Sequence, residues 1–298
     1  MRNDIRTLCF DEDLQLEACC FQGITQPFPN HFHEYYVIGI VDGGQRQMTC
    51  RDREYTIQAG NVLAFQPGDN HGCRQMGGEP FSYRSFHIPK KTVRLWTRKL
   101  GLEEEFLCFK DNVIEDRELA ASIRRLHETV MGNGSREEKE EAMGSVFILL
   151  LEGYALLDKE NTRRYREEVE LVCRYMQNHL TEEISLKQMC RAVGLSKSTL
   201  MRKFGKSKGL TPYRYLESIR INEGKKLLEE GVFPAQAAAC TGFYDQSHFT
   251  NFFRSFIGLA PGAYRNMVLE GREKKHRKDE KDRGEGRGGK QGNGTQRK

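Results

Sequence analysis

Features that would place a chain in several special classes are missing from these 298 residues. The most apolar stretch, residues 146–151, ends at Glu152 and is far shorter than the ~20 residues that a membrane helix requires. The nine cysteines include no C-x-x-C pair, which argues against a disulfide scaffold or a zinc finger. The first residues lack the apolar core of a signal peptide. We therefore expect a soluble cytoplasmic protein that has no contact with membranes.

Charge is divided unevenly along the chain. Residues 1–164 carry 21 Lys and Arg against 26 Asp and Glu, a net charge of −5. Residues 165–269 carry 15 against 10 and residues 270–298 carry 11 against 6, a net charge of +5 in each segment. The length of the chain favours two domains over one. This distribution predicts that only the basic C-terminal part meets a polyanion.

Short β-strands are predicted for the front part of the chain. Runs rich in branched and aromatic residues are separated by turn signals such as Asp42-Gly43-Gly44 and Pro67-Gly68-Asp69. The runs are residues 14–21, 35–41, 55–57, 62–65 and 83–88. Many short strands at close spacing favour a barrel or sandwich over alternating βαβ units, so residues 1–90 are expected to form a β-barrel domain.

Residues 91–160 are predicted to be helical. Residues 116–131 place apolar side chains at helical spacing, and Ser135 with Glu138 forms a capping box for a second helix. The apolar face of that second helix comprises Met143, Val146, Phe147, Leu150, Leu151, Tyr154 and Leu157. A face this broad suits either packing within one chain or a dimer interface, and we expect a homodimer.

Two segments are expected to lie outside the folded domains. Residues 158–166 are polar and break the apolar pattern, which predicts a linker, placed at residues 161–168. Residues 269–298 consist almost exclusively of Gly, Lys, Arg and Glu. Such a composition cannot bury apolar area, so a disordered tail is expected.

A repeat with an offset of 49 residues organises residues 169–268. Phe204, Gly209, Leu210 and Pro212 recur as Phe253, Gly258, Leu259 and Pro261. Each copy ends a unit predicted to be helix, tight turn, helix, with Ser196 and Asp245 capping the second helix of the two units. A capped helix over residues 211–230, ~27 Å long, joins the units. This rod suits two recognition helices spaced by about one DNA turn (~34 Å).

The outward side chains of these two second helices are the candidate DNA-binding residues. In the first unit they are Lys197, Ser198, Met201, Arg202 and Lys203. In the second unit they are Gln246, Ser247, Thr250, Asn251 and Arg254. Polar side chains on an exposed helix can reach base edges in the major groove. Two units at a fixed offset in a basic segment therefore predict double-stranded DNA as the partner.

The run from Gly242 to Arg254 (GFYDQSHFTNFFR), closing in Gly258-Leu259-Ala260-Pro261, resembles the signature of AraC/XylS-type transcription regulators. Gly194-Leu195-Ser196 and Gly209-Leu210-Thr211-Pro212 resemble the first unit of that family, so the resemblance covers about residues 169–266. It implies that Ser198, Met201 and Arg202 face bases. Arg202 is the best candidate for a bidentate guanine contact, worth ~1–3 kcal/mol of discrimination. Many family members carry a basic residue at the position of Asn251, which implies a weaker contact by the second unit.

Histidines of the front domain are the candidate effector site. His31 and His33 on one strand point to the same face, and His71 on a facing strand could complete a metal site. The pattern resembles the cupin barrel, the usual sensor of that family, but the carboxylate of metal-binding cupins is replaced by Val37 and Ile38. A small-molecule pocket, a metal site, and histidines satisfied by turns and core are the three alternatives. The candidate ligand-binding residues, whose inward direction depends on strand register, are His31, His33, Tyr35, His71, Arg84 and His87.

We therefore predict an α+β multidomain protein. Its expected parts are a cupin-like barrel with a helical dimerisation segment and an all-α domain with two helix-turn-helix units joined by a long helix. The predicted function is a transcription regulator that responds to a small-molecule effector and acts with RNA polymerase, without catalytic residues, metal or cofactor. One alternative is a metal-dependent cupin enzyme fused to a DNA-binding domain. Another is an architectural DNA binder with a vestigial barrel.

Overall fold

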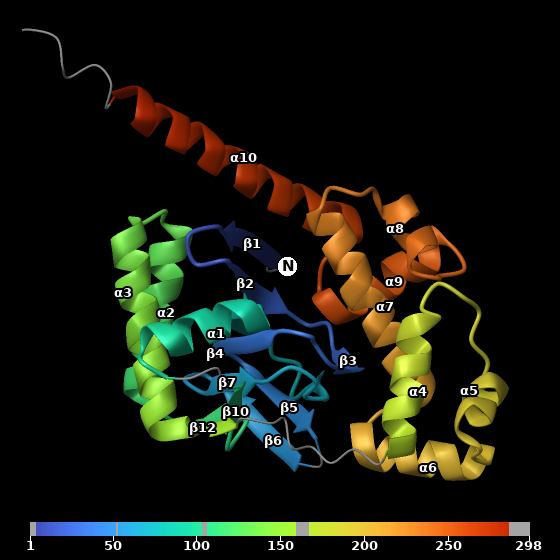
Figure 1. The fold of residues 1–298 in the computed structure, drawn as a ribbon. Coiled ribbons are helices and arrows are strands. Elements are labelled where there is room, and N and C mark those ends of the chain that lie inside the picture. The colour runs from blue at the N-terminus through green and yellow to red at the C-terminus, as the bar shows by residue number, and fades with distance from the viewer. Residues whose placement is uncertain (1–3, 52, 103–105, 159–166, 286–298) are drawn as a thin grey trace, which may run out of the picture.

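The computed structural model describes residues 4–51, 53–102, 106–158 and 167–285. An N-terminal half (residues 4–158), rich in β-strands, packs against a helical C-terminal half (residues 167–285) (Figure 1). This is the predicted fold class, although the strands are not closed into one hydrogen-bonded barrel. Of the predicted linker, residues 161–166 lie outside the described residues, and 167–168 already begin a helix.

Two antiparallel sheets form most of the N-terminal half. The six-stranded sheet has the order β1-β2-β9-β4-β7-β11, and the four-stranded sheet has the order β3-β8-β5-β6. The strands are β1 (Ile5–Asp11), β2 (Leu16–Ile24), β3 (Phe28–His31), β4 (Tyr36–Gly43), β5 (Gln45–Cys50), β6 (Arg53–Gln58), β7 (Val62–Phe65), β8 (His71–Gln75), β9 (Phe81–Ile88) and β11 (Val113–Ile114). A separate pair joins β10 (Phe106–Phe109) to β12 (Ala155–Asp158). Val37 and Phe65 from one sheet share a core with Met48 and Ile57 from the other.

The six-stranded sheet is covered on both faces, which explains why residues 36–41 of β4 are apolar and buried. Its outer face, with Ile38 and Ile40, packs against helices α1 (Lys90–Lys99), α2 (Arg117–Met131) and α3 (Arg136–Leu149). Full burial of each such side chain stabilises the fold by ~1.5–3 kcal/mol relative to exposure.

The apolar face of α3 lies inside this layer. Met143, Val146 and Phe147 are at most 1% exposed, so the face serves core packing within the chain. Ser135 and Glu138 form the predicted capping box. The helix is shorter than expected, because a π-helical turn (Leu150–Tyr154) follows Leu149 and leads into β12.

Helices make up the C-terminal half, and their start and stop signals match the sequence prediction. The helices are α4 (Glu167–Asn178), α5 (Leu186–Val193), α6 (Lys197–Lys208), α7 (Pro212–Glu229), α8 (Pro234–Cys240), α9 (Gln246–Ile257) and α10 (Pro261–Glu285). The repeat has a structural reason. Gly209 and Gly258 end α6 and α9 with φ of +67° and +86°, a left-handed conformation that favours glycine. Phe204 and Phe253 are fully buried in the two units.

Helix α10 is longer than the sequence suggested. Residues 269–285, expected to be disordered, continue the helix, which runs away from the rest of the molecule (Figure 1). Lys, Arg and Glu have high helix propensity, so a charged segment can extend a helix that packed residues have started. Near its beginning, Tyr264 and Val268 are fully buried, and the Arg272 guanidinium lies 5.3 Å from the ring centre of Phe10 in β1.

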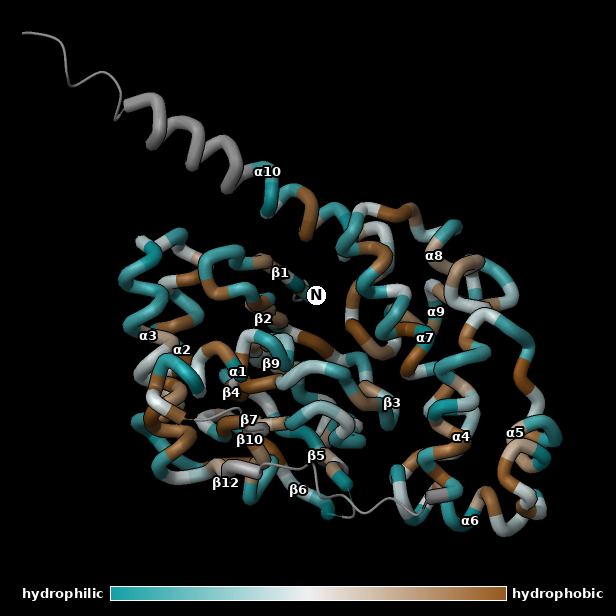
Figure 2. The backbone as a smooth tube through the Cα atoms, viewed as in Figure 1, coloured by the Kyte–Doolittle hydropathy of each residue, from teal (hydrophilic) through white to brown (hydrophobic). Residues whose placement is uncertain are grey.

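The two halves share apolar clusters. Phe21 and Ile24 of β2 are buried together with Phe256 and Ile257 of α9. Phe32, which follows β3, stacks on Tyr215 of α7 with ring centres 4.9 Å apart. Figure 2 shows hydrophobic stretches along the strands and along helices of the C-terminal half. The helical half is therefore docked on the sheets through an apolar interface.

Candidate functional site

The outward side of α6 carries one side chain suited to base recognition. Lys197, Ser198 and Arg202 are exposed, and Met201 is half-buried. Lys203 is half-buried, and its ammonium forms an ion pair with Glu168 of α4. The planar guanidinium of Arg202 presents a fork of donors that matches the two acceptors of guanine.

Helix α9 presents two chemically different sides. Gln246, Ser247, Asn251 and Arg254 are exposed, and Thr250 is half-buried. The opposite side is a buried stripe made of Phe249, Phe253, Phe256 and Ile257. Just before the Asp245 N-cap, Tyr244 is 94% exposed, and it is absent from the set predicted from the sequence. A large exposed ring at this position was not predictable from periodicity, because turn residues follow no repeat.

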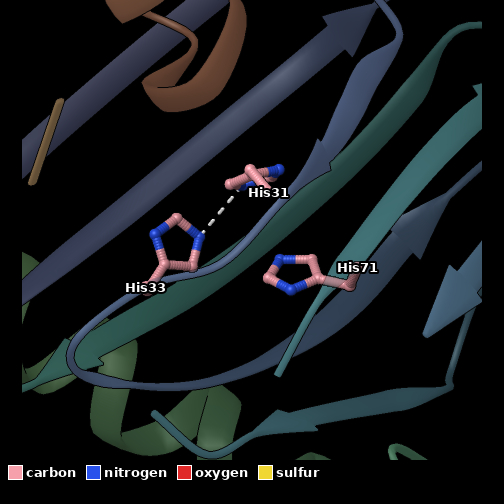
Figure 3. Close-up of side chains that lie close together, drawn as sticks. All are labelled: His31, His33 and His71. Carbon is pink, nitrogen blue, oxygen red and sulfur yellow. Dashed lines mark hydrogen bonds between the residues drawn. The ribbon is translucent and has the colours of Figure 1, made fainter. Parts of the chain in front are cut away.

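Three imidazoles meet where β3 pairs with β8 (Figure 3). His31 and His71 are direct cross-strand partners, with ring centres 4.6 Å apart. His33 lies beyond the end of β3, yet its Nε2 is 3.1 Å from Nε2 of His31. Nδ1 of His31 lies 2.7 Å from the Pro29 carbonyl oxygen, and Nδ1 of His71 lies 3.0 Å from that of Asp69. Because carbonyls only accept, both Nδ1 atoms carry protons, and Nε2 of each ring is left as an acceptor.

These histidines are neutral groups. Burial, with a smaller contribution from His71, lowers the pKa of His31 to about 3. Burial also lowers the pKa of His33 and of His71. Nitrogen atoms of the three rings lie within 4.8 Å of one another, a grouping that could hold a metal ion. Without an ion, His31 and His33 share a hydrogen bond between their Nε2 atoms.

A cavity of about 90 Å³ lies beside these histidines, between the two sheets. Apolar side chains in its lining include Phe21, Phe28, Met48, Ile57, Phe65 and Phe81. His31, His33, His71 and His87 contribute polar atoms from the predicted set. From the C-terminal half, Phe256 and Ile257 complete the wall, and Phe256 stacks on His31 with ring centres 5.3 Å apart. The cavity is thus built by both halves of the chain.

Two of the predicted ligand-binding residues do not line this cavity. Ser85 and His87 of β9 face it, so Arg84, of opposite parity, lies on the other side of the strand and pairs with Asp42 at 2.8 Å. Tyr35 instead stacks on His33, and its ring centre lies 4.2 Å from Nζ of Lys225. Strand parity alone would have removed Arg84 from a set that contains His87.

A buried ionic network joins the halves beside the cavity. Glu17 of β2 accepts hydrogen bonds from Lys225 of α7 at 2.7 Å, from His87 at 2.9 Å and from the Tyr264 hydroxyl of α10. Burial alone would raise the pKa of Glu17, but the Lys225 ammonium and His87 outweigh it and hold that pKa below its usual range. Glu17, Cys19 and His87 also form a possible ligand group, in which Glu17 is already occupied by these contacts.

The structure so far defines a class: a protein with two joined helix-turn-helix units docked on a β-rich half, and a cavity lined by residues of both. Within the described ranges, no helix has the length and apolar character needed to cross a bilayer. A model of the AraC-like ligand binding domain matches residues 17–147, and a model of a helix-turn-helix domain matches residues 189–267.

Similar proteins agree with this class. The chain is 39% identical over 249 residues to the uncharacterized HTH-type transcriptional regulator YbfI of Bacillus subtilis, covering 83% of this chain and 90% of YbfI. It is 24% identical over 260 residues to the HTH-type transcriptional activator RhaS of Pectobacterium carotovorum, with coverage of 83% and 90%. The crystal structure of ToxT from Vibrio cholerae O395 has a similar fold, with a TM-score of 0.54, 18% identity, and coverage of 85% of this chain and 98% of ToxT.

The chain belongs to the AraC family of DNA-binding transcription regulators, as the sequence resemblance predicted. Its N-terminal half contains the ligand-binding domain of that family, and its C-terminal half contains the helix-turn-helix domain.

Proposed function

We propose that a small effector bound in the cavity controls how α9 is presented to double-stranded DNA. The observation that carries this proposal is the position of Phe256 and Ile257, which line the cavity at one end of α9. The other end of the same helix exposes Gln246 and Ser247. An effector that binds the docked and released arrangements of α9 with different affinity shifts the balance between them. The sensor and the DNA-binding surface are therefore coupled through one rigid helix.

Polar contacts support the docked arrangement. Nε2 of Gln26 donates to the carbonyl of Arg254 in α9 at 3.0 Å. Nδ2 of Asn70 donates to the carbonyl of Gly209, at the end of α6, at 2.9 Å. Each recognition helix is thus tied by its C-terminal end to the N-terminal half, so effector binding can act on both.

Specific residues have roles in this proposal. Arg202, with Ser198 and Met201, contacts DNA from α6, and the exposed residues of α9 make further contacts. The effector is contacted by His31, His33, His71 and His87, without a catalytic residue, metal or cofactor. The protein acts in the cytoplasm as a homodimer, together with RNA polymerase. The alternative of a cupin enzyme gains no support, since the relatives are described as transcriptional regulators.

The double variant Gln26→Ala, Asn70→Ala tests the coupling. It removes two hydrogen bonds between the halves, each worth about 0.5–1.5 kcal/mol, and leaves both the cavity lining and the reading side intact. We expect the affinity for operator DNA without effector to rise by about fivefold or more. Operators are first identified by genome-wide mapping of bound DNA, and affinity is measured by fluorescence anisotropy.

Gln45→Ala is the matched control, because Gln45 pairs with Gln58 on the sheet surface, within the N-terminal half. This variant should bind operator DNA as the wild type does. The coupling proposal fails if the double variant and the control have the same affinity as the wild type.

A further inference from the structure

Arg46 of β5 is a buried cation with unused hydrogen-bond donors. Arg46 is 0% exposed, and its guanidinium lies 5.4 Å from the ring centre of Phe81. Nη2 donates to the carbonyl of Ile24 at 2.6 Å. Nε and Nη1 have no hydrogen-bond partner within the described part of the chain. No carboxylate among the described residues forms an ion pair with this guanidinium.

A buried arginine with unpaired donors is unfavourable in a protein that functions without a bound ligand. A guanidinium does not lose its proton in proteins, so burial cannot neutralise Arg46. A buried charge without a counter-charge is strongly destabilising, and a buried donor without an acceptor adds to that cost. The free donors on Nε and Nη1 of Arg46 point to a partner that the described residues do not supply.

The position of Arg46 connects it with the effector cavity. Arg46, Met48 and Cys50 are the buried residues of β5, and Met48 lines the cavity. Phe81, which lies under the guanidinium, also lines it. Arg46 does not itself line the cavity, but it lies next to two residues that do, Met48 and Phe81.

The histidines lie at the opposite end of the same pair of strands. In the β5–β8 ladder, Arg46 faces Gln75, Met48 faces Cys73, and Cys50 faces His71. Arg46 and Cys50 are four positions apart along β5, which at ~3.3 Å per residue corresponds to ~13 Å. This pair of strands thus offers a cation just beyond the cavity lining at one end, apolar side chains in the middle, and the neutral acceptor Nε2 of His71 at the other.

We propose that the effector is a small amphipathic carboxylate that accepts hydrogen bonds from the unpartnered donors of Arg46. Hydrogen bonds between a guanidinium and a carboxylate are charge-assisted and stronger than neutral ones, and the buried site excludes competing water. The apolar part of the effector lies against Met48 and Phe81 and extends toward the histidines. This inference rests on the proposed function only in taking the cavity as the effector site.

Ligand binding by the full-length protein tests the assignment. The probes are straight-chain carboxylates from butanoate to decanoate and benzoate, each compared with its own primary amide at equal ionic strength. We expect at least one acid to bind at least tenfold more tightly than its amide by isothermal titration calorimetry. Sodium chloride and inorganic phosphate should give no such binding, which separates a carboxylate site from a general anion site.

Three variants locate the binding. Arg46→Met should abolish the preference for the acid while the amide affinity changes by less than threefold. Arg46→Lys should retain part of the preference, because it keeps the positive charge but places its donors differently. Arg53→Met, which removes an exposed arginine of the neighbouring strand β6, should behave as the wild type.

The proposal is overturned if no acid in the series is preferred, or if the preference survives in Arg46→Met. Circular dichroism and operator binding confirm that Arg46→Met is folded, and removal of an unpaired buried charge should not lower its melting temperature. A neutral amide that binds and alters DNA affinity would refute the carboxylate and leave the effector-controlled regulator intact.

Discussion

Arg202 is the exposed side chain of α6 whose shape matches a base edge. We predict that Arg202→Ala weakens binding to operator DNA by about 10- to 100-fold, corresponding to ~1–3 kcal/mol for a bidentate base contact. Binding to random-sequence DNA should fall much less, because phosphate contacts dominate there. Competition binding with both DNAs measures the two losses.

Lys206→Ala is the comparison for Arg202, since Lys206 is exposed on the same helix but was not predicted to reach bases. It should reduce binding to both DNAs by a similar small factor. An equal loss on operator and random DNA for Arg202→Ala would mean that Arg202 touches only phosphate.

The close packing of α7 against α9 depends on a glycine in α7. A Cβ at Gly224 of α7 would lie 2.6 Å from Cε2 of Phe249, which is fully buried in α9. We predict that Gly224→Ala destabilises the protein by ~1–3 kcal/mol through overpacking. The gain of ~0.5–1 kcal/mol in helix propensity does not offset this effect. Chemical denaturation monitored by circular dichroism gives the difference.

Gly205→Ala is the matched control within α6, because a Cβ there has no atom within 4 Å. The same substitution should stabilise that helix by up to ~1 kcal/mol. Two equally stabilised variants would show that α7 and α9 are not tightly packed.

Helices of the C-terminal half could be predicted because their signals are local. Ser196 and Asp245 cap helices as expected, and the long helix predicted over residues 211–230 is α7 (Pro212–Glu229), which Thr211 caps. Strands β1 and β5 were not predicted. They contain many polar residues, and cross-strand pairing defines them more than composition does.

Only some of the residues around the cavity could be predicted from the sequence. Histidines at positions 31, 33 and 71 indicated a cluster in the sequence, since their spacing carries a chemical signal. Phe256 and Arg46 gave no comparable signal. Phe256 belongs to the buried apolar stripe of α9, which indicates helix packing, and its contact with His31 depends on how the halves dock. The inward direction of Arg46 depends on register, which a one-residue slip would reverse.

The stability of the whole molecule should depend on pH through its buried histidines. Burial lowers the pKa of His31 to about 3, while a histidine in the unfolded chain titrates near 6.5. Below pH 6.5 the unfolded state therefore binds a proton that the folded state does not. Stability should fall by ~1.4 kcal/mol per pH unit for each such histidine until the folded pKa is reached.

Melting temperatures between pH 7 and pH 5 test this dependence. His31→Gln should reduce the slope by about one proton. If this variant keeps the wild-type slope, His31 does not differ in protonation between the folded and unfolded states as its burial requires.

The position of Phe256 and Ile257 in the cavity wall affects how the two domains can be exchanged between regulators, by engineering or in evolution. Residues that belong to the DNA-binding domain by sequence also shape the effector cavity. A chimaera that joins this sensor to the DNA-binding domain of another regulator would therefore acquire a different cavity wall. Its effector selectivity would change along with its operator, unless both residues were transplanted together with the sensor.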